Sequence, residues 1–374
     1  MTRPDWIVVF IIPSLKIKAQ AVNDVGLTLG LTGMALVARD DPRVQAYCEW
    51  SPAASTLLSR FLTEYSRPHD PTRLVAHRRW LDSFGKRAEP VIAFRNAVAM
   101  ACVCHVRANG GWQGASWTES FDHHAAEVAV DGSHVDILTP ALQSFAAPVE
   151  DMVFTLEHGL PVAEYIFSDE RLAVWLGKAW LDTYRNGRNV AAGRTLFRSL
   201  ELAYMAASMR SRNYSSIHEV GVGTVLWVNA IEILAAPSDR NVRRLDGHAL
   251  VEQFVWDMNP LLDSRRYRVV EHRRPKIKYR GAKLVAKVYD HLYEARSKFV
   301  HGDQVSRALL RPFGPDPAPP LLALASTVYR TALLAYLQRH WKWTRQMEAK
   351  DHLGTFWLSA YEQHLLKAVD QEVD

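Results

Sequence analysis

Leu-Tyr-Glu-Ala-Arg-Ser-Lys-Phe-Val-His-Gly-Asp, residues 292–303, is the stretch that decides the fold of the C-terminal half. It ends an amphipathic segment, 283–300, whose apolar side chains recur with helical spacing on one half of the wheel. Arg296 is the only charged side chain on that half, where a guanidinium is costly to bury without a partner. His301 follows five residues later, and Gly302 is typical of a helix end. The pair suggests phosphodiester chemistry, with the imidazole moving protons and the guanidinium holding phosphate.

The spacing of this pair is not specific by itself. Composition alone predicts several arginine and histidine pairs four to six residues apart, and Arg212/His218 and Arg345/His352 are examples. Only the pair at 296 and 301 ends a long amphipathic segment, with its arginine on the apolar side and a glycine behind its histidine. The context of the motif therefore carries the prediction.

The segment 292–303 resembles the signature of HEPN domains, particularly the ApeA-like branch, in which an Arg and a His four to six residues apart close a helix. Residues 225–234, with Glu232, are similar to the helix with a central glutamate that precedes the motif in that branch. Residues 321–341 fit the helix that follows it. The similarity covers the C-terminal half, and the Arg/His motif is its only chemically specific part.

This resemblance implies a helical bundle that often dimerises and, in many members, a metal-independent ribonuclease of a toxin or antiphage system. In active members the Arg and His of two protomers form one composite site, and these roles fall here on Arg296 and His301. Active members often have Asn, Asp or His after the arginine, whereas Ser297 stands here and can still hydrogen-bond to phosphate. Glu294 and Asp303 flank the pair, where they could orient the imidazole or simply be exposed.

Both motif residues also have purely structural interpretations. Arg296 could pair with Glu232 across the bundle, and His301 could be a helix C-cap that interacts with the dipole. An arginine sealed against that glutamate would argue against an enzyme. Two functions stay open: an endoribonuclease that uses the RNA 2′-hydroxyl as nucleophile, and a non-catalytic HEPN module that binds RNA or a partner protein. Enzyme status is thus undecided from the sequence.

A basic stretch leads into the motif segment. Between Arg265 and Lys287 there are ten Lys or Arg residues and one acid, so this stretch carries +9, whereas the whole chain carries +5. Tyr267 and Tyr279 are interleaved as possible stacking platforms for bases. The pattern predicts salt-dependent binding of RNA or another polyanion, and a solvated loop is the other interpretation. The predicted RNA-binding residues are Arg265, Arg266, Arg268, Arg273, Arg274, Lys276, Lys278 and Arg280.

Composition indicates a soluble globular protein. The chain has 374 residues, 48% hydrophobic and 23% charged, which is enough for two domains. The apolar run 6–12 is too short to span a bilayer and no other stretch approaches 18 apolar residues, so we expect a cytoplasmic protein without a membrane partner. Three cysteines are too few for a disulfide framework, and Cys102 and Cys104 are interpreted as core residues. We expect no metal and no cofactor.

The predicted fold class is α+β, with a C-terminal all-α HEPN-like helical bundle preceded by a mixed α/β region. The mixed region, 1–155, has no assigned fold, and the bundle occupies 165–374. We expect a homodimer, with the N-terminal region or a regulatory partner restraining its activity. The smaller basic cluster Arg240, Arg243 and Arg244 is interpreted as exposed charge. Strands are predicted at 6–12, 34–38, 125–130 and 134–138, and helices at 53–65, 89–105, 168–184, 191–210, 217–235, 283–300, 321–341 and 353–369.

Overall fold

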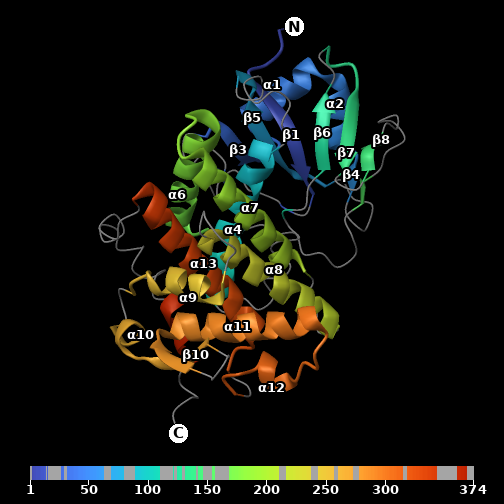
Figure 1. Ribbon diagram of the computed structural model, residues 1–374. Helices are drawn as coiled ribbons and strands as arrows, with labels where there is room; N and C mark the ends of the chain where they lie inside the picture. Colours follow the sequence, from blue (N-terminus) through green and yellow to red (C-terminus); the bar gives the residue numbers. More distant parts are fainter. Residues whose placement is uncertain are drawn as a thin grey trace. The chain divides into compact units, whose positions relative to one another are not determined.

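The fold is α+β, as predicted (Figure 1). The chain divides into two units. The first unit contains residues 1–98 and 116–167, and the second contains 99–115 and 168–374. The computed structural model describes residues 2–13, 15, 27–28, 32–62, 69–79, 89–109, 121, 124–128, 131–139, 142–145, 154–155, 168–209, 216–236, 243–256, 260–272, 278–314, 318–342 and 360–368.

The first unit is built on an antiparallel sheet with the strand order β2-β3-β5-β1-β6-β7-β8. Its strands are β1 (Trp6–Ile12), β2 (Leu27–Thr28), β3 (Met34–Val37), β5 (Thr72–His77), β6 (His124–Val128), β7 (Val135–Thr139) and β8 (Leu142–Phe145). Side chains of β1, β3, β5 and β7 form one apolar cluster with those of α1 (Pro42–Trp50) and α2 (Pro52–Ser59). All four predicted strands are confirmed, and the turn at Gly132 joins β6 to β7 with a φ of 75°.

Two predictions for this unit were wrong in detail. The helix expected over 53–65 ends at Ser59, and β4 (Phe61–Leu62) follows it and pairs in parallel with β9 (Phe154–Thr155). The mixed region was also expected to hold all of 1–155, but residues 99–115 belong to the second unit. These residues join the second unit because α4 (Glu89–Ala108) continues past residue 98 as one helix. Within the second unit, its Ala101 carbonyl accepts a hydrogen bond from the Asp169 backbone N–H at 3.2 Å.

The second unit is predominantly helical. Helix α8 packs against α7, α9, α11 and α13, and the side chains of α13 are almost all buried from end to end. The predicted helices of this unit are confirmed to within a few residues at each boundary, although only 360–366 of the terminal one is described as helical. The helices are α6 (Glu170–Trp180) with a π-helical turn at Leu181–Arg185, α7 (Val190–Ser208), α8 (Ile217–Ala235), α9 (Arg244–Glu252), α10 (Pro260–Ser264), α11 (Leu284–His301), α12 (Arg307–Leu310) and α13 (Leu321–Trp341).

The second unit is not all-α, which corrects the predicted fold class. Strands β10 (Tyr267–His272) and β11 (Lys278–Ala282) form an antiparallel hairpin in the basic stretch that was expected to be irregular. Tyr267 and Val269 alternate with exposed Arg268, and this period of two places the apolar side chains on the buried face of the hairpin. The hairpin leads directly into α11.

Two helices, α4 and α8, are long and apolar enough on average to cross a membrane, despite the expectation that no further stretch would qualify. The apolar window of α4 is 83% buried inside the protein, as expected of a core helix, whereas that of α8 is 44% buried. Cys102 and Cys104 lie on α4 and are fully buried, which confirms their interpretation as core residues. The cytoplasmic location stays a prediction.

Candidate nucleic-acid interface and motif helix

Helix α11 carries the Arg/His motif and ends where the sequence predicts. Gly302 adopts the left-handed conformation with a φ of 73° and forms the C-cap. The backbone N–H groups of Gly302 and Asp303 both donate to the Lys298 carbonyl, the latter at 2.9 Å. These bonds satisfy a carbonyl of the last turn and keep His301 inside the helix.

The buried face of α11 differs from the predicted one in its charged residue. Leu284, Val288 and Leu292 are buried as expected, but so is Asp290, which the helical wheel assigned to the solvated side. Val300, expected inside, is 52% exposed. Burial is therefore concentrated in the N-terminal two thirds of the helix, and the end that carries the motif is more open.

Arg296 is half-buried and contacts the glutamate that the sequence suggested. Its side chain is 25% exposed, and its Nη2 atom lies 3.6 Å from Oε2 of Glu232 on α8. Its guanidinium carbon lies 5.7 Å from the centre of the Tyr293 ring. Burial raises the pKa of Glu232, against the effect of Arg296. The contact is long and the arginine is partly open, so Arg296 is paired with Glu232 without being sealed against it.

His301 is exposed in the last turn of α11. Five residues at 100° each place its side chain about 140° around the axis from that of Arg296, so the two diverge on one helix. Helical spacing instead places His301 on the same face as Glu294 and Ser297, both half-buried, while Asp303 is exposed beyond the C-cap. The side chains of Arg296 and His301 therefore lie on different sides of α11 within one chain.

The hairpin presents one polar face and buries the other. Tyr267, Val269 and Ala282 are buried, so the prediction of Tyr267 as a stacking platform was wrong. Tyr279 is 46% exposed on the outer face. The guanidinium carbon of Arg268 lies 3.6 Å from the centre of the Tyr279 ring, a close cation–π stack between the two strands.

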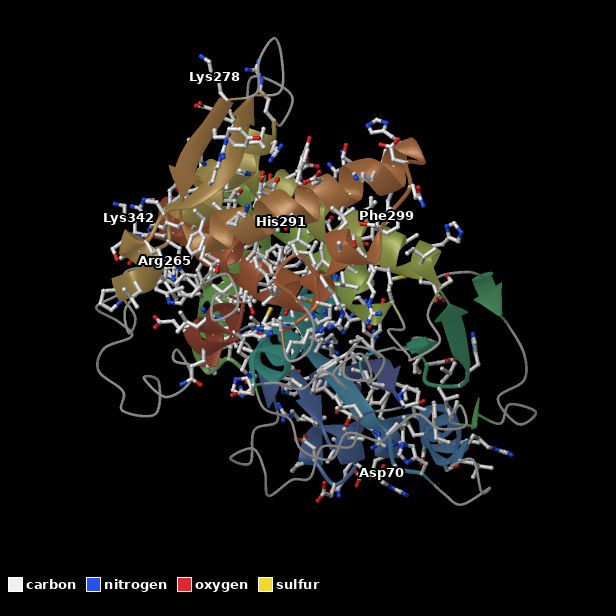
Figure 2. All side chains as sticks on the ribbon, turned by 90° about the horizontal axis from the view of Figure 1, so that it is seen from below. Asp70, Arg265, Lys278, His291, Phe299 and Lys342 are labelled. Carbon is white, nitrogen blue, oxygen red and sulfur yellow. The ribbon has the colours of Figure 1, made fainter. Side chains whose placement is uncertain are left out.

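The predicted RNA-binding cations differ in their exposure and in their contacts. Arg265, Arg266, Arg268 and Lys278 are exposed, and Figure 2 shows Lys278 at the end of a hairpin strand, where β11 begins. Arg280 is half-buried and forms an ion pair with Glu252, with 2.9 Å between Nη1 and Oε2. Its charge is therefore paired within the protein. Arg273, Arg274 and Lys276 lie outside the described residues.

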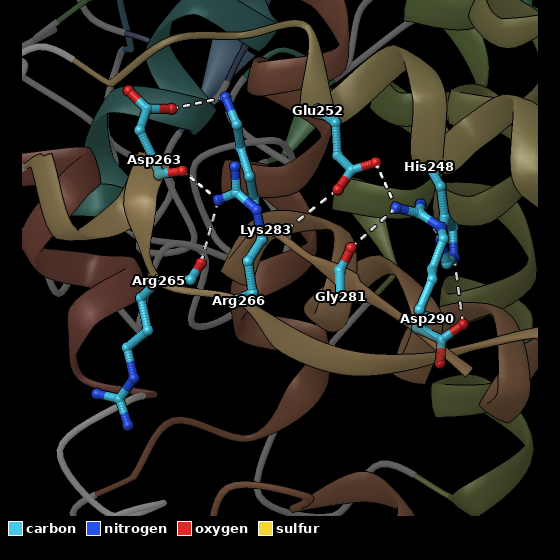
Figure 3. A network of polar contacts seen from close by, with 9 residues as sticks. His248, Glu252, Asp263, Arg265, Arg266, Gly281, Lys283 and Asp290 are labelled. Atoms are coloured by element: carbon cyan, nitrogen blue, oxygen red, sulfur yellow. Dashed lines mark hydrogen bonds and ion pairs between the residues drawn. The ribbon is translucent and has the colours of Figure 1, made fainter.

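A network of polar contacts holds the hairpin against α9 and α11 (Figure 3). The Nζ atom of Lys283 lies 2.6 Å from an Asp263 carboxylate oxygen, and its backbone N–H donates to Glu252 at 3.1 Å. The Lys287 ammonium donates to the Arg268 carbonyl at 3.0 Å. The hairpin is thus tied to the first turn of α11.

His248 connects this network to Asp290. Its Nδ1 accepts a hydrogen bond from Arg280 at 3.1 Å, so the proton of the neutral ring resides on Nε2, which lies 3.1 Å from an Asp290 carboxylate oxygen. Arg244 pairs with the same carboxylate oxygen, which corrects its interpretation as exposed charge. Burial, together with Arg244 and Arg280, lowers the pKa of His248 to about 3. It is a neutral structural connector and not a general base.

Sequence reasoning missed this cluster, although a signal was present. Arg244, His248 and Glu252 are spaced four residues apart, which places all three on one face of α9. Within the described ranges no group of three or more His, Cys, Asp and Glu side chains is arranged to hold a metal ion. The polar contacts described above are ion pairs and hydrogen bonds between side chains and backbone groups.

The hairpin and the motif lie at opposite ends of α11. Lys287, which touches β10, precedes Arg296 by nine residues and His301 by fourteen, or about 14 and 21 Å along the axis. In Figure 2 Lys278 and Phe299 mark these two ends. The basic stretch is therefore next to the motif in sequence but separated from it in space.

Comparisons with protein-family models, with curated proteins and with solved structures found no match. The relation to HEPN domains therefore rests on the resemblance of 292–303 and its flanking helices. It stays a prediction.

Proposed function

We propose that the helical unit is a HEPN-like module that binds RNA through its hairpin and, as a homodimer, cleaves it with Arg296 and His301. The observation that carries the binding step is the outer face of the hairpin, where Arg268 is stacked on Tyr279 beside exposed Lys278. Proteins commonly bind a single nucleic-acid strand with cations that pair with its phosphates and aromatic rings on which its bases stack. A role in a bacterial defence or toxin-like system follows from the family resemblance alone.

The cleavage step would use the 2′-hydroxyl of the RNA as the nucleophile. His301 accepts its proton while the O2′–P bond forms, and His301 of the second protomer protonates the leaving 5′-oxygen as the P–O5′ bond breaks. Arg296 stabilises the additional negative charge on the phosphorane-like transition state. The products are a 2′,3′-cyclic phosphate and a 5′-hydroxyl. Because the two side chains diverge on one helix, a productive site needs residues from both protomers.

An incompletely covered face of α8 supports the dimer. Val222, Val225, Leu226 and Ile233 recur at helical spacing on one side of α8; Val222 is 48% exposed and the other three are partly exposed. Phe299 of α11 lies against Gly221 of the same helix, which places the motif end of α11 beside this face. A two-fold axis near the face would bring two copies of the motif together.

The alternative function is a non-catalytic module that binds RNA or a partner protein. It is favoured by the contact between Arg296 and Glu232, because a carboxylate beside a guanidinium competes with phosphate for it. It is also favoured by Ser297 in the position that active HEPN members often fill with Asn, Asp or His.

Cleavage of total RNA by purified protein in EDTA separates the two functions. We expect cyclic-phosphate ends from the wild type, loss of cleavage in Arg296→Ala and His301→Ala, and retention in Lys298→Ala, a cation on the same helix between them. Salt-dependent RNA binding without cleavage by any of the proteins would favour the non-catalytic module. Neither binding nor cleavage by the wild type would contradict both RNA functions.

A further inference from the structure

We infer that the hairpin selects single-stranded over duplex RNA, because an unpaired base extends the stack of Arg268 on Tyr279. This inference rests on the proposed RNA-binding function and specifies its ligand. The guanidinium carbon lies 3.6 Å from the ring centre, so Arg268 covers one face of Tyr279. The opposite side of the planar guanidinium faces away from the ring, and a base can stack there as it does on arginine planes in RNA complexes.

The geometry of the hairpin prepares this stack before any ligand arrives. In the strand register Arg268 is opposite Gly281, and Val270 is opposite Tyr279, so the arginine and the tyrosine are diagonal neighbours on one face. The Arg266 side chain packs over this glycine, where a Cβ would lie 3.2 Å from the Arg266 Cβ. A preorganised stack binds a base with less loss of side-chain entropy than two mobile side chains would.

The backbone beneath the stack is held in place by the rest of the unit. Lys287 donates to the Arg268 carbonyl, and the inner face of the hairpin is buried at Val269 and Ala282. Arg280 ties β11 to Glu252 from the inner side. The stack is thus presented by a fixed ribbon. Exposed Lys278 adds charge beside it, and the guanidinium carbon of Arg265 lies 5.3 Å from the centre of the buried Tyr267 ring.

Duplex RNA cannot use this stack. Its bases are already stacked on one another, and its major groove is too deep and narrow for side chains to reach the base edges. A duplex therefore offers the hairpin phosphates and minor-groove 2′-hydroxyls but no open base face, and every exposed cation contributes to the phosphate contacts in the same way. A single strand offers phosphates and an open base, so its additional affinity depends on the flat shapes of Arg268 and Tyr279.

The test is fluorescence anisotropy at fixed salt with three probes: a single-stranded RNA, its duplex, and a strand of the same length with abasic residues. The wild type should bind the single strand most tightly. Arg268→Lys keeps the charge and loses the plane, and Tyr279→Ala loses the ring. Each should weaken binding of the single strand by about fivefold to a hundredfold, the range of one base stack, and leave the other two probes nearly unchanged.

Matched variants identify the cause of any loss. Tyr279→Phe keeps the ring and should bind as the wild type does, while Lys278→Ala removes a neighbouring charge and should weaken all three probes alike. Thermal unfolding followed by circular dichroism confirms that each variant is folded. Equal affinity of the wild type for single strand and duplex, or equal losses on all probes in Arg268→Lys, would overturn the inference. Failure of the wild type to bind any probe would instead overturn the proposed function itself.

Discussion

Among the acidic residues of α11, Asp290 should contribute most to the stability of the second unit. Its carboxylate is buried and is shared by Arg244 and the Nε2 side of His248. Asp290→Ala removes the buried carboxylate that Arg244 and His248 share, so we expect the free energy of unfolding to fall by about 3–5 kcal/mol. Asp303→Ala, an exposed acid just past the same helix, should change it by less than about 0.5 kcal/mol. Urea denaturation of both variants measures the difference, and similar losses would show that the Asp290 pair is not stabilising.

At the scale of residues, the sequence indicated several important residues but did not predict the burial of every charged side chain. Arg296, Glu232 and Gly302 have the contact or conformation that was suggested as possible for each. The helical wheel failed for Asp290, because a wheel describes one helix and cannot show that Arg244 and His248 of α9 approach from the other side. Whether a charged side chain is buried depends on the residues that pair with it, and these residues are distant in sequence.

Two glycines of α8 provide a test at the scale of the element. A Cβ on Gly221 would lie 2.5 Å from the Phe299 ring, whereas a Cβ on Gly223 would meet its nearest side-chain atom at 3.9 Å. Gly221→Ala should therefore destabilise the protein by about 1–3 kcal/mol through overpacking. Gly223→Ala should stabilise it by about 0.5–1 kcal/mol, because alanine is the better helix former. Thermal melts of both variants compare them directly, and a stabilising Gly221→Ala would contradict the close packing of α8 on α11.

The helices of the second unit could be predicted because their periodicity is local. The hairpin was missed because its two short strands lie in a stretch rich in Lys and Arg, and its alternation is visible only through Tyr267 and Val269. The same oversight affected β5, which reads as a short basic and apolar run but pairs with both β1 and β3. Strand partners come from distant parts of the chain, so no local pattern contains the sheet order.

Acid should destabilise the whole molecule below neutrality. Burial lowers the pKa of His248 to about 3 and those of His291 and His364 to about 4, from an ordinary value of 6.5. Nearby Arg244, Lys287 and Lys367 act in the same direction as burial. As pH falls from 6.5 toward 4, the unfolded chain takes up protons that the folded one does not, so stability is lost across this window. Each histidine contributes at most about 1.4 kcal/mol per pH unit.

Urea denaturation at pH 7.5 and pH 5 measures this loss. The variant His301→Ala serves as the control, because it removes an exposed imidazole and keeps His248, His291 and His364. Unfolding free energies that are equal at the two pH values would show that the buried histidines are not held in their neutral form. The loss is distributed over α9, α11 and the segment 360–366, which is why it belongs to the molecule and not to one helix.

The length of α11 has a further consequence for the proposed cleavage of RNA. One uninterrupted helix of 18 residues joins the hairpin, which is proposed to bind RNA, to Arg296 and His301, which are proposed to cleave it. A strand held at Tyr279 would be cut at a set number of nucleotides from the held base, so the helix would act as a molecular ruler. The products would then share a common spacing between one preferred unpaired base and the new end, whatever the sequence between them.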